Sequence, residues 1–212
     1  MTIKKPVNKT KQAPPAEVSR CSWCGSDPLY MDYHDHVWGR PEADSLALFE
    51  KLCLDGQQAG LSWITILRKQ ESYRQAYDNF DPEKIVRYTE HKKAQLLKNP
   101  GVIRNKLKVE SIIKNARGYL QMQEEGIAFN EFLWDFVNGQ PIQNRPASLK
   151  EVAVNTPESD AMSKALKKRG FTFVGSTICY AFMQAVGMVN DHFAHCHCWD
   201  ECHELGKQFS LS

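Results

Sequence analysis

The chain has 212 residues, of which 42% are hydrophobic and 25% charged, and its formal net charge is +2. This composition excludes an intrinsically disordered protein, and the length is sufficient for one substantial hydrophobic core, so we expect a single globular domain. No apolar run is long enough to cross a bilayer, and residues 1–20 lack the apolar centre of a secretory signal, which favours a cytoplasmic protein without a membrane partner. The small net charge neither requires nor excludes a polyanionic partner.

The first segment, "MTIKKPVNKTKQAPPAEVSR", is basic, contains proline and is almost free of large apolar side chains. Such a segment buries too little apolar surface to repay the entropy of ordering. We therefore predict a disordered tail over residues 1–20, a single all-α domain over residues 21–200 and a flexible C-terminal tail over residues 201–212.

Helical patterns then follow one another along the chain. In "DSLALFEKLCL", Asp44 is a candidate N-cap, and apolar residues recur at spacings of three or four, as one buried helical face requires. Asp81 marks a second helix start, and further amphipathic candidates cover residues 106–126, 128–139 and 156–170. No strand-like alternation lasts long enough to build a sheet, so the predicted fold is all-α.

Cysteine and histidine gather near both ends of the expected domain. Seven cysteines in a chain without a secretory signal argue against a disulfide framework. Thiolate and imidazole are the usual ligands of tetrahedral zinc, and a site with two ligands from each group would join the two ends of the domain. Spacing alone does not select the ligands, and a surplus of unligated thiols is the alternative. The candidates are Cys21, Cys24, His34 and His36 in the first group, and His192, His195, Cys196, His197, Cys198, Cys202 and His203 in the second.

The segment "RGFTFVGSTICYAFMQAVGMVNDH" has the pattern of a helix-hairpin-helix. A basic helix ends at Gly170, a short turn follows, and a new apolar helix starts near Ser176. Glycine at position 175 would let a phosphate approach the backbone, and the N–H groups that open the second helix would point at that anion. The alternative is an ordinary turn that follows a solvated basic helix face. The predicted DNA contacts are Lys167, Lys168, Arg169, Gly175 and Ser176.

Aromatic residues and one acid recur in "DPLYMDYHDHVWG" and "CLDGQQAGLSWITIL". Aromatic rings stack on the faces of an unstacked nucleobase, while a carboxylate accepts hydrogen bonds from its edge. A cationic base would be favoured further by cation–π attraction and charge pairing. Taken singly, each aromatic residue is better explained by burial in the core. The pocket candidates are Tyr30, Tyr33, Trp38, Asp55 and Trp63.

Together, "DPLYMDYHDHVWG", "LFEKLCLDGQQAGLSWITIL" and "SDAMSKALKKRGFTFVGSTICYAFMQAVGMVNDH" closely resemble the DNA-3-methyladenine glycosylase I family of helix-hairpin-helix repair enzymes. The resemblance runs from about Cys21 to Cys198. It implies a monomeric enzyme that flips 3-methyladenine out of double-stranded alkylated DNA and hydrolyses its N-glycosidic bond, which leaves an abasic site and free 3-methyladenine. It also implies one structural zinc ion that joins the two ends of the domain, with the other cysteines and histidines as bystanders. The implied ligands are Cys21, His34, His192 and Cys196.

The resemblance also places Tyr33, Trp63 and the acid at position 55 against the flipped base, with Tyr30 and Trp38 at the pocket wall. This chain has Asp55 where the family has glutamate, so its carboxylate is one methylene shorter. Contact with the base then requires a bridging water or a small backbone shift, or else recognition is weakened. We expect the pocket to select a cationic methylated base by its shape and by this single negative side chain.

Two further residues have weaker assignments. Leu61 is a candidate wedge that fills the space vacated by the base, although an apolar residue in a helical region usually belongs to the core. Asp191 follows the second helix of the hairpin, and we expect a helix-terminus or turn residue there rather than a catalytic one. The alternative functions are a non-catalytic binder of alkylated DNA, if Asp55 recognises without cleavage, and a zinc-organised interaction module that uses the Cys/His-rich C-terminal segment.

Overall fold

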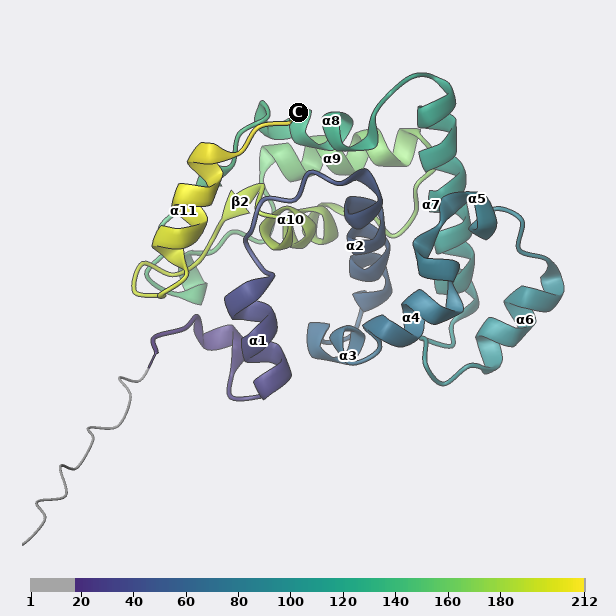
Figure 1. The fold of residues 1–212 in the computed structure, drawn as a ribbon, viewed down its shortest axis with the longest axis horizontal. Coiled ribbons are helices and arrows are strands. Elements are labelled where there is room, and N and C mark those ends of the chain that lie inside the picture. The colour runs from purple at the N-terminus through teal and green to yellow at the C-terminus, as the bar shows by residue number, and fades with distance from the viewer. Residues whose placement is uncertain (1–17, 212) are drawn as a thin grey trace, which may run out of the picture.

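The structure is a computed structural model that describes residues 18–211, so residues 1–17 of the tail predicted over residues 1–20 lie outside the described part. Almost all of the regular structure is helical, as the sequence predicts (Figure 1). No helix within residues 18–211 combines the length and apolarity that crossing a bilayer requires. The helices are α1 (Pro28–His36), α2 (Ser45–Gln58), α3 (Trp63–Leu67), α4 (Gln70–Ala76), α5 (Pro82–Ile85), α6 (Glu90–Lys98), α7 (Lys106–Glu124), α8 (Phe129–Trp134), α9 (Pro157–Lys168), α10 (Ser176–Ala185) and α11 (Trp199–Gln208).

Short elements complete the described chain. The strands β1 (Ile142–Gln143) and β2 (Val189–Asn190) pair in parallel, which the sequence analysis did not predict. The pairing joins the connection after α8 to the segment after α10. Short 3-10 turns cover Ser22–Cys24, Asp78–Phe80, Asp135–Val137 and Leu149–Glu151.

The predicted helix starts are confirmed at the level of single hydrogen bonds. The Asp44 side chain accepts from the Ala47 N–H at 2.8 Å at the start of α2, and Asp81 caps α5 in the same way. Thr156 and Ser159 form a reciprocal capping box at the start of α9. Each cap satisfies N–H groups that the first turn of a helix leaves without intrahelical partners.

The helix α10 lies near the middle of the molecule and packs against α2 and α9 (Figure 1). Two glycines explain how closely the turn before α10 is packed. A Cβ at Gly56 in α2 would lie 3.0 Å from the Cβ of Phe173, and one at Gly118 in α7 would lie 2.5 Å from the ring of Phe171. Glycine therefore lets both helices approach the turn.

The C-terminal segment differs from the flexible tail predicted for residues 201–212. Residues Trp199–Gln208 form α11, in which Cys202 and Gly206 are buried. The Phe209 ring then stacks on Trp134 with 4.1 Å between ring centroids. This apolar contact stabilises a segment whose polar composition alone indicates a tail.

A lysine from α7 caps the C-terminal end of α2. Lys108 Nζ donates to the carbonyl oxygens of Gln57 at 2.6 Å and Ala59 at 2.7 Å. The Gln57 side chain in turn donates to the Lys108 carbonyl and accepts from the Tyr73 hydroxyl. Burial lowers the pKa of Lys108. These bonds satisfy carbonyls at the end of the helix and fix the turn over residues 59–62.

Replacing Lys108 with methionine keeps the apolar stem but removes both donors, and we expect the free energy of unfolding to fall by about 2 to 4 kcal/mol. Urea denaturation measures this change. The control is Lys106→Met, an exposed position in the first turn of α7, which should change stability by less than about 0.5 kcal/mol. Equal stability of the two variants would contradict the capping role of Lys108.

Candidate active site and metal site

A cavity of about 400 Å³ is lined by residues of α1, α2, α3 and α10 and by part of the segment between β1 and α9. This volume is within the range of small-molecule sites. The cavity brings together side chains from motifs that are far apart in the sequence. All of the pocket candidates line it, namely Tyr30, Tyr33, Trp38, Asp55 and Trp63.

Aromatic rings form a continuous wall of this cavity. The rings of Tyr33 and Trp63 lie 5.5 Å apart between centroids, and the Tyr30 ring lies 6.4 Å from that of Tyr33. Trp23, which the sequence analysis did not select, lies 4.9 Å from Trp38 and extends the wall. The rings are therefore both core residues and cavity lining, so the two interpretations of each aromatic residue are compatible.

Asp55 is the acidic residue of this wall, and its side chain is only 3% exposed. Its Oδ1 pairs with Lys51, whereas its Oδ2 has no hydrogen-bond partner among residues 18–211. Burial raises the pKa of Asp55, and the charge of Lys51 opposes that shift. A buried carboxylate oxygen without a partner is a group that a ligand is able to satisfy.

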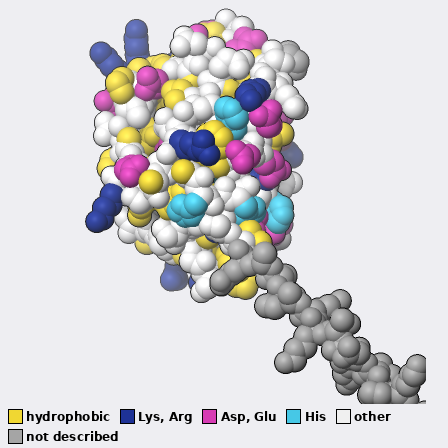
Figure 2. Space-filling view, turned by 90° about the vertical axis from the view of Figure 1, so that its left-hand side faces the viewer, with side chains coloured by type: hydrophobic (Ala, Val, Ile, Leu, Met, Phe, Trp, Pro, Cys, Tyr) yellow, Lys and Arg dark blue, Asp and Glu magenta, His cyan; other side chains and the backbone are white. Residues whose placement is uncertain are grey.

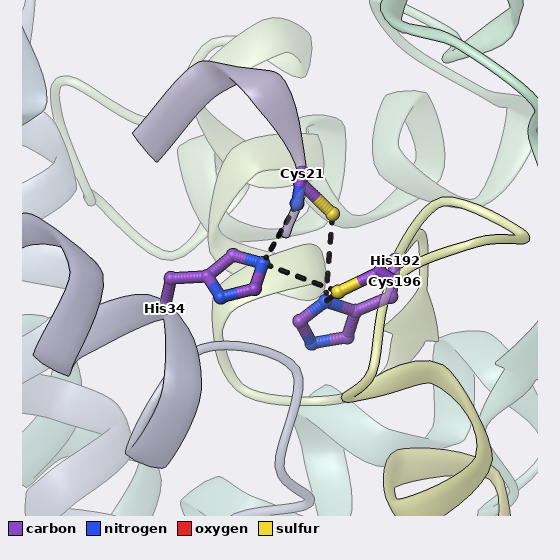
Figure 3. A group of neighbouring side chains, drawn as sticks. All are labelled: Cys21, His34, His192 and Cys196. Atoms are coloured by element: carbon purple, nitrogen blue, oxygen red, sulfur yellow. Dashed lines mark hydrogen bonds between the residues drawn. The ribbon is translucent and has the colours of Figure 1, made fainter. Parts of the chain in front are cut away.

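The predicted metal ligands also meet in space. Cys21, His34, His192 and Cys196 are all buried, and their side chains point toward one another (Figure 3). The Sγ atoms of Cys21 and Cys196 lie 3.6 and 3.5 Å from His192 Nδ1, and Cys196 Sγ lies 3.4 Å from His34 Nε2. Tetrahedral zinc with ordinary bond lengths separates sulfur from nitrogen by about 3.6 Å. The donor set and its spacing therefore fit a tetrahedral metal ion.

The second nitrogen of each histidine bonds to oxygen, as is usual for metal-ligating histidines. His34 Nδ1 lies 2.8 Å from Asp35 Oδ1, and His192 Nε2 lies 3.2 Å from the Trp38 carbonyl oxygen. Gly39 has a φ of +82°, and a Cβ there would lie 2.8 Å from His192 Nε2. A glycine is therefore required beside this histidine.

A second group able to hold a metal shares His34 and adds Asp35, His197 and Cys198. Arg20 donates to both carboxylate oxygens of Asp35, from Nε at 2.8 Å and from Nη2 at 2.7 Å. The Arg20 guanidinium thus occupies the carboxylate oxygens that a second metal ion would need. We therefore interpret the second group as the hydrogen-bonding support of His34.

The side of the molecule that carries α11 shows histidine, acidic and basic side chains interspersed on its surface (Figure 2). No patch of one charge dominates that face in the figure. This face is therefore of mixed charge and unlike a DNA-binding face.

The predicted hairpin is present between α9 and α10. Asn115 of α7 bonds to both backbone groups of Thr172, and Ser163 of α9 donates to the Val174 carbonyl at 2.6 Å. Gly175 is the N-cap of α10, and a Cβ there would meet no atom of the described residues within 4 Å. The backbone at the start of α10 is therefore open to an approaching group.

The predicted DNA contacts around this hairpin differ in their surroundings. Lys167 and Lys168 are exposed at the end of α9. Arg169 instead bonds to Glu125 at 2.9 Å and lies over the Phe132 ring, so it also stabilises the packing of α7 and α8. The Ser176 hydroxyl bonds to Asp160 and thereby lowers the pKa of that carboxyl. The backbone N–H of Ser176 lies in the first turn of α10, where N–H groups have no intrahelical partner.

Leu61 is 41% exposed in the turn after α2 and is not part of the core. Gln58, three residues earlier, lines the cavity, and its carbonyl accepts from the Leu61 N–H at 2.7 Å. Leu61 itself is not among the residues that line the cavity, and its role as a wedge stays a prediction.

A sequence profile of the methyladenine glycosylase family matches residues 23–199. DNA-3-methyladenine glycosylase 1 of Escherichia coli strain K12 is 53% identical over 182 residues, which cover 86% of this chain and 97% of that protein. A crystal structure of 3-methyladenine DNA glycosylase I has a TM-score of 0.84 at 54% identity and covers 85% of this chain and 99% of that one. A crystal structure of a Tyr-to-Phe variant of 3-methyladenine DNA glycosylase I with bound 3-methyladenine has a TM-score of 0.81 at 38% identity, and covers 85% of this chain and 97% of that one. The chain belongs to the methyladenine glycosylase family.

In this member of the methyladenine glycosylase family, the cavity contains a lysine that the sequence analysis missed. Lys51 pairs with Asp55, and its Nζ lies 3.9 Å from the centroid of the Trp63 ring. Burial lowers the pKa of Lys51, and Asp55 opposes that shift. The cavity therefore holds a buried cation beside the carboxylate that the sequence predicts. The sequence feature that could have revealed this ion pair is the spacing of four residues between Lys51 and Asp55, which places both on one helix face.

Asp191 also lines the cavity of this methyladenine glycosylase family member, a position that its sequence context did not indicate. Its carboxylate accepts from Asn144 at 2.8 Å and from Tyr180 and Gln184 at 2.7 Å each. These three bonds hold the carboxylate in the wall. That Asp191 is a helix-terminus or turn residue rather than a catalytic one stays a prediction.

Proposed function

We propose that this chain is a base-excision-repair glycosylase that flips 3-methyladenine out of double-stranded alkylated DNA and hydrolyses its N-glycosidic bond. The observation that carries the proposal is the cavity in which Tyr33 and Trp63 lie beside the buried carboxylate of Asp55. Membership of the methyladenine glycosylase family and the likeness to a structure with bound 3-methyladenine support it. The proposal includes a cytoplasmic, monomeric protein.

Hydrolysis follows from the charge of the lesion. Methylation at N3 makes the base of the nucleotide cationic, so it leaves the sugar more readily than neutral adenine. The C1′–N9 bond breaks with its electron pair going to the base, which becomes neutral, and water adds to C1′ with loss of a proton. The protein contributes a cavity of fixed shape, stacking by Trp63 and Tyr33, and extrusion of a damaged base that pairs weakly in the duplex.

The DNA would lie across the hairpin before α10 and the turn that carries Leu61. Lys167 and Lys168 are exposed cations beside the hairpin, and the open backbone at Gly175 admits a phosphate. Leu61 would enter the stack in place of the flipped base. Lys167 and Lys168 are the stronger assignments in the basic segment, because Arg169 already pairs with Glu125.

Incubation of the protein with methylated duplex DNA tests the proposal directly. We expect free 3-methyladenine in the supernatant and an equal number of abasic sites in the DNA. Retention of the duplex without release of base would instead establish a non-catalytic binder, because recognition would then occur without cleavage.

Trp63→Ala separates base recognition from duplex binding. The variant should lose roughly 1 to 3 kcal/mol of binding free energy for 3-methyladenine, because one stacking face is removed. Its affinity for undamaged duplex should stay close to that of the wild-type protein and keep the same salt dependence. Calorimetry with the free base and anisotropy with labelled DNA measure the two quantities. Collapse of undamaged-duplex binding would contradict the assignment of Trp63 to the pocket.

We further propose that Cys21, His34, His192 and Cys196 hold one structural zinc ion. The sulfur–nitrogen distances and the oxygen partners of both histidines support this ligand set. Four protein ligands complete a tetrahedral shell, so the ion would stabilise the fold without taking part in the chemistry.

Cys196→Ser should lower both the zinc content and the melting temperature, since a closed structural site contributes on the order of 10 kcal/mol to folding. Cys24→Ser is the matched control, because Cys24 is equally buried and lies outside the ligand group. Mass spectrometry of bound metal and thermal unfolding give the two readouts. An unchanged zinc content in Cys196→Ser would show that the ligand set is wrong.

A further inference from the structure

Lys51 is a buried cation inside a site proposed for a cationic base, and no part of the proposed reaction uses it. It lies on α2, one turn before Asp55, and its side chain is 14% exposed. Its Nζ pairs with Asp55 Oδ1 and lies 3.9 Å from the centroid of the Trp63 ring. Both partners line the cavity, as Lys51 itself does.

The ammonium retains donor capacity toward the cavity. An ammonium has three N–H donors. Within residues 18–211, Asp55 is the one hydrogen-bond acceptor of Lys51 Nζ, and the Trp63 ring face takes a second direction. The remaining donor has no acceptor in this part of the chain. Because Asp55 and Trp63 fix the ammonium from two sides, that donor is aimed rather than freely rotating.

We propose that Lys51 is a further specificity-determining residue: its ammonium, held by Asp55 and Trp63, donates a hydrogen bond to a ring nitrogen of the flipped base. This inference rests on the proposed function. Asp55 then acts as a positioning residue.

The chemistry of the base fits such a donor. Adenine carries acceptor nitrogens, N1 and N7, on either side of its amino group, and methylation at N3 leaves both in place. As the C1′–N9 bond breaks, the electron pair of that bond neutralises the base, and its ring nitrogens become stronger acceptors. Lys51 keeps its proton throughout. Its hydrogen bond therefore strengthens toward the transition state, while its repulsion of the cationic base weakens.

The alternative is that Lys51 only neutralises Asp55 and occupies the space of the base. The two roles predict opposite effects of removing the ammonium. A hydrogen-bond donor increases affinity for the neutral free base, so its loss weakens binding. An internal competitor decreases that affinity, so its loss strengthens binding.

The test compares 3-methyladenine with its 1-deaza and 7-deaza analogues, each of which lacks one acceptor nitrogen. The wild-type protein should bind one analogue about tenfold more weakly than the parent base. Lys51→Met should bind the parent base about tenfold more weakly and lose the discrimination against that analogue. Lys51→Gln, which retains an N–H donor without the charge, should keep part of this discrimination. Calorimetry measures the affinities, and thermal unfolding verifies that each variant is folded.

The matched control is Lys93→Met. Lys93 pairs with Glu90 on α6 at 2.6 Å, so it is also a lysine–carboxylate pair within one helix, but it lies outside the cavity. This variant should behave as the wild-type protein does. If Lys51→Met keeps the same discrimination, or binds 3-methyladenine more tightly than the wild-type protein, the inference is overturned.

Single-turnover release from methylated duplex adds a second readout. Lys51→Met should slow base release by a larger factor than it weakens binding of the damaged duplex. Equal factors, or no change in release, would contradict a donor that acts in the transition state. Failure of the wild-type protein to release any base would refute the proposed function. Release by the wild-type protein with unaltered behaviour of Lys51→Met would refute this inference alone.

Discussion

Burial of one carboxylate in an aromatic cavity is the constraint on which the rest of the site depends. An ionised carboxylate out of contact with water is costly unless a countercharge lies beside it. Asp55 obtains that countercharge from Lys51 on the same helix, and the ring of Trp63 shares the ammonium. The helix α2 must therefore continue through Asp55, since a helix brings the side chains of residues four apart into contact. The bonds from Lys108 hold the end of that helix and the turn that follows.

Two of the four proposed metal ligands lie next in sequence to residues that line the same cavity. His34 is the sequence neighbour of Tyr33 on α1, and His192 is the sequence neighbour of Asp191 after β2. A bond between these histidines through a shared ion would therefore fix the aromatic wall and the Asp191 wall relative to each other. The side chains of Cys21 and His34 meet those of His192 and Cys196 at this point (Figure 3). An ion held there would thus link stability to pocket geometry without taking part in the chemistry.

Much of this arrangement follows from local sequence signals. The remaining features depend on tertiary contacts. Caps such as Thr156 and the glycine turn before α10 are set by a few adjacent residues, so the sequence predicts them. The pocket and ligand residues follow from a family resemblance whose motifs are long. Lys51 was missed because a lysine on an amphipathic helix is normally solvated, and only the fold reveals its burial. The ordering of α11 depends on the contact between Phe209 and Trp134, which are far apart in the sequence.

We expect Asp55 to be ionised inside the cavity because Lys51 lies beside it. Titration of the Asp55 carboxyl carbon by NMR, in the wild-type protein and in Lys51→Met, tests it most directly. We expect an ionised Asp55 at neutral pH in the wild-type protein. Its pKa should rise further in Lys51→Met, because burial then acts without a countercharge. A protonated Asp55 at neutral pH in the wild-type protein, or the same pKa in both proteins, would contradict the account.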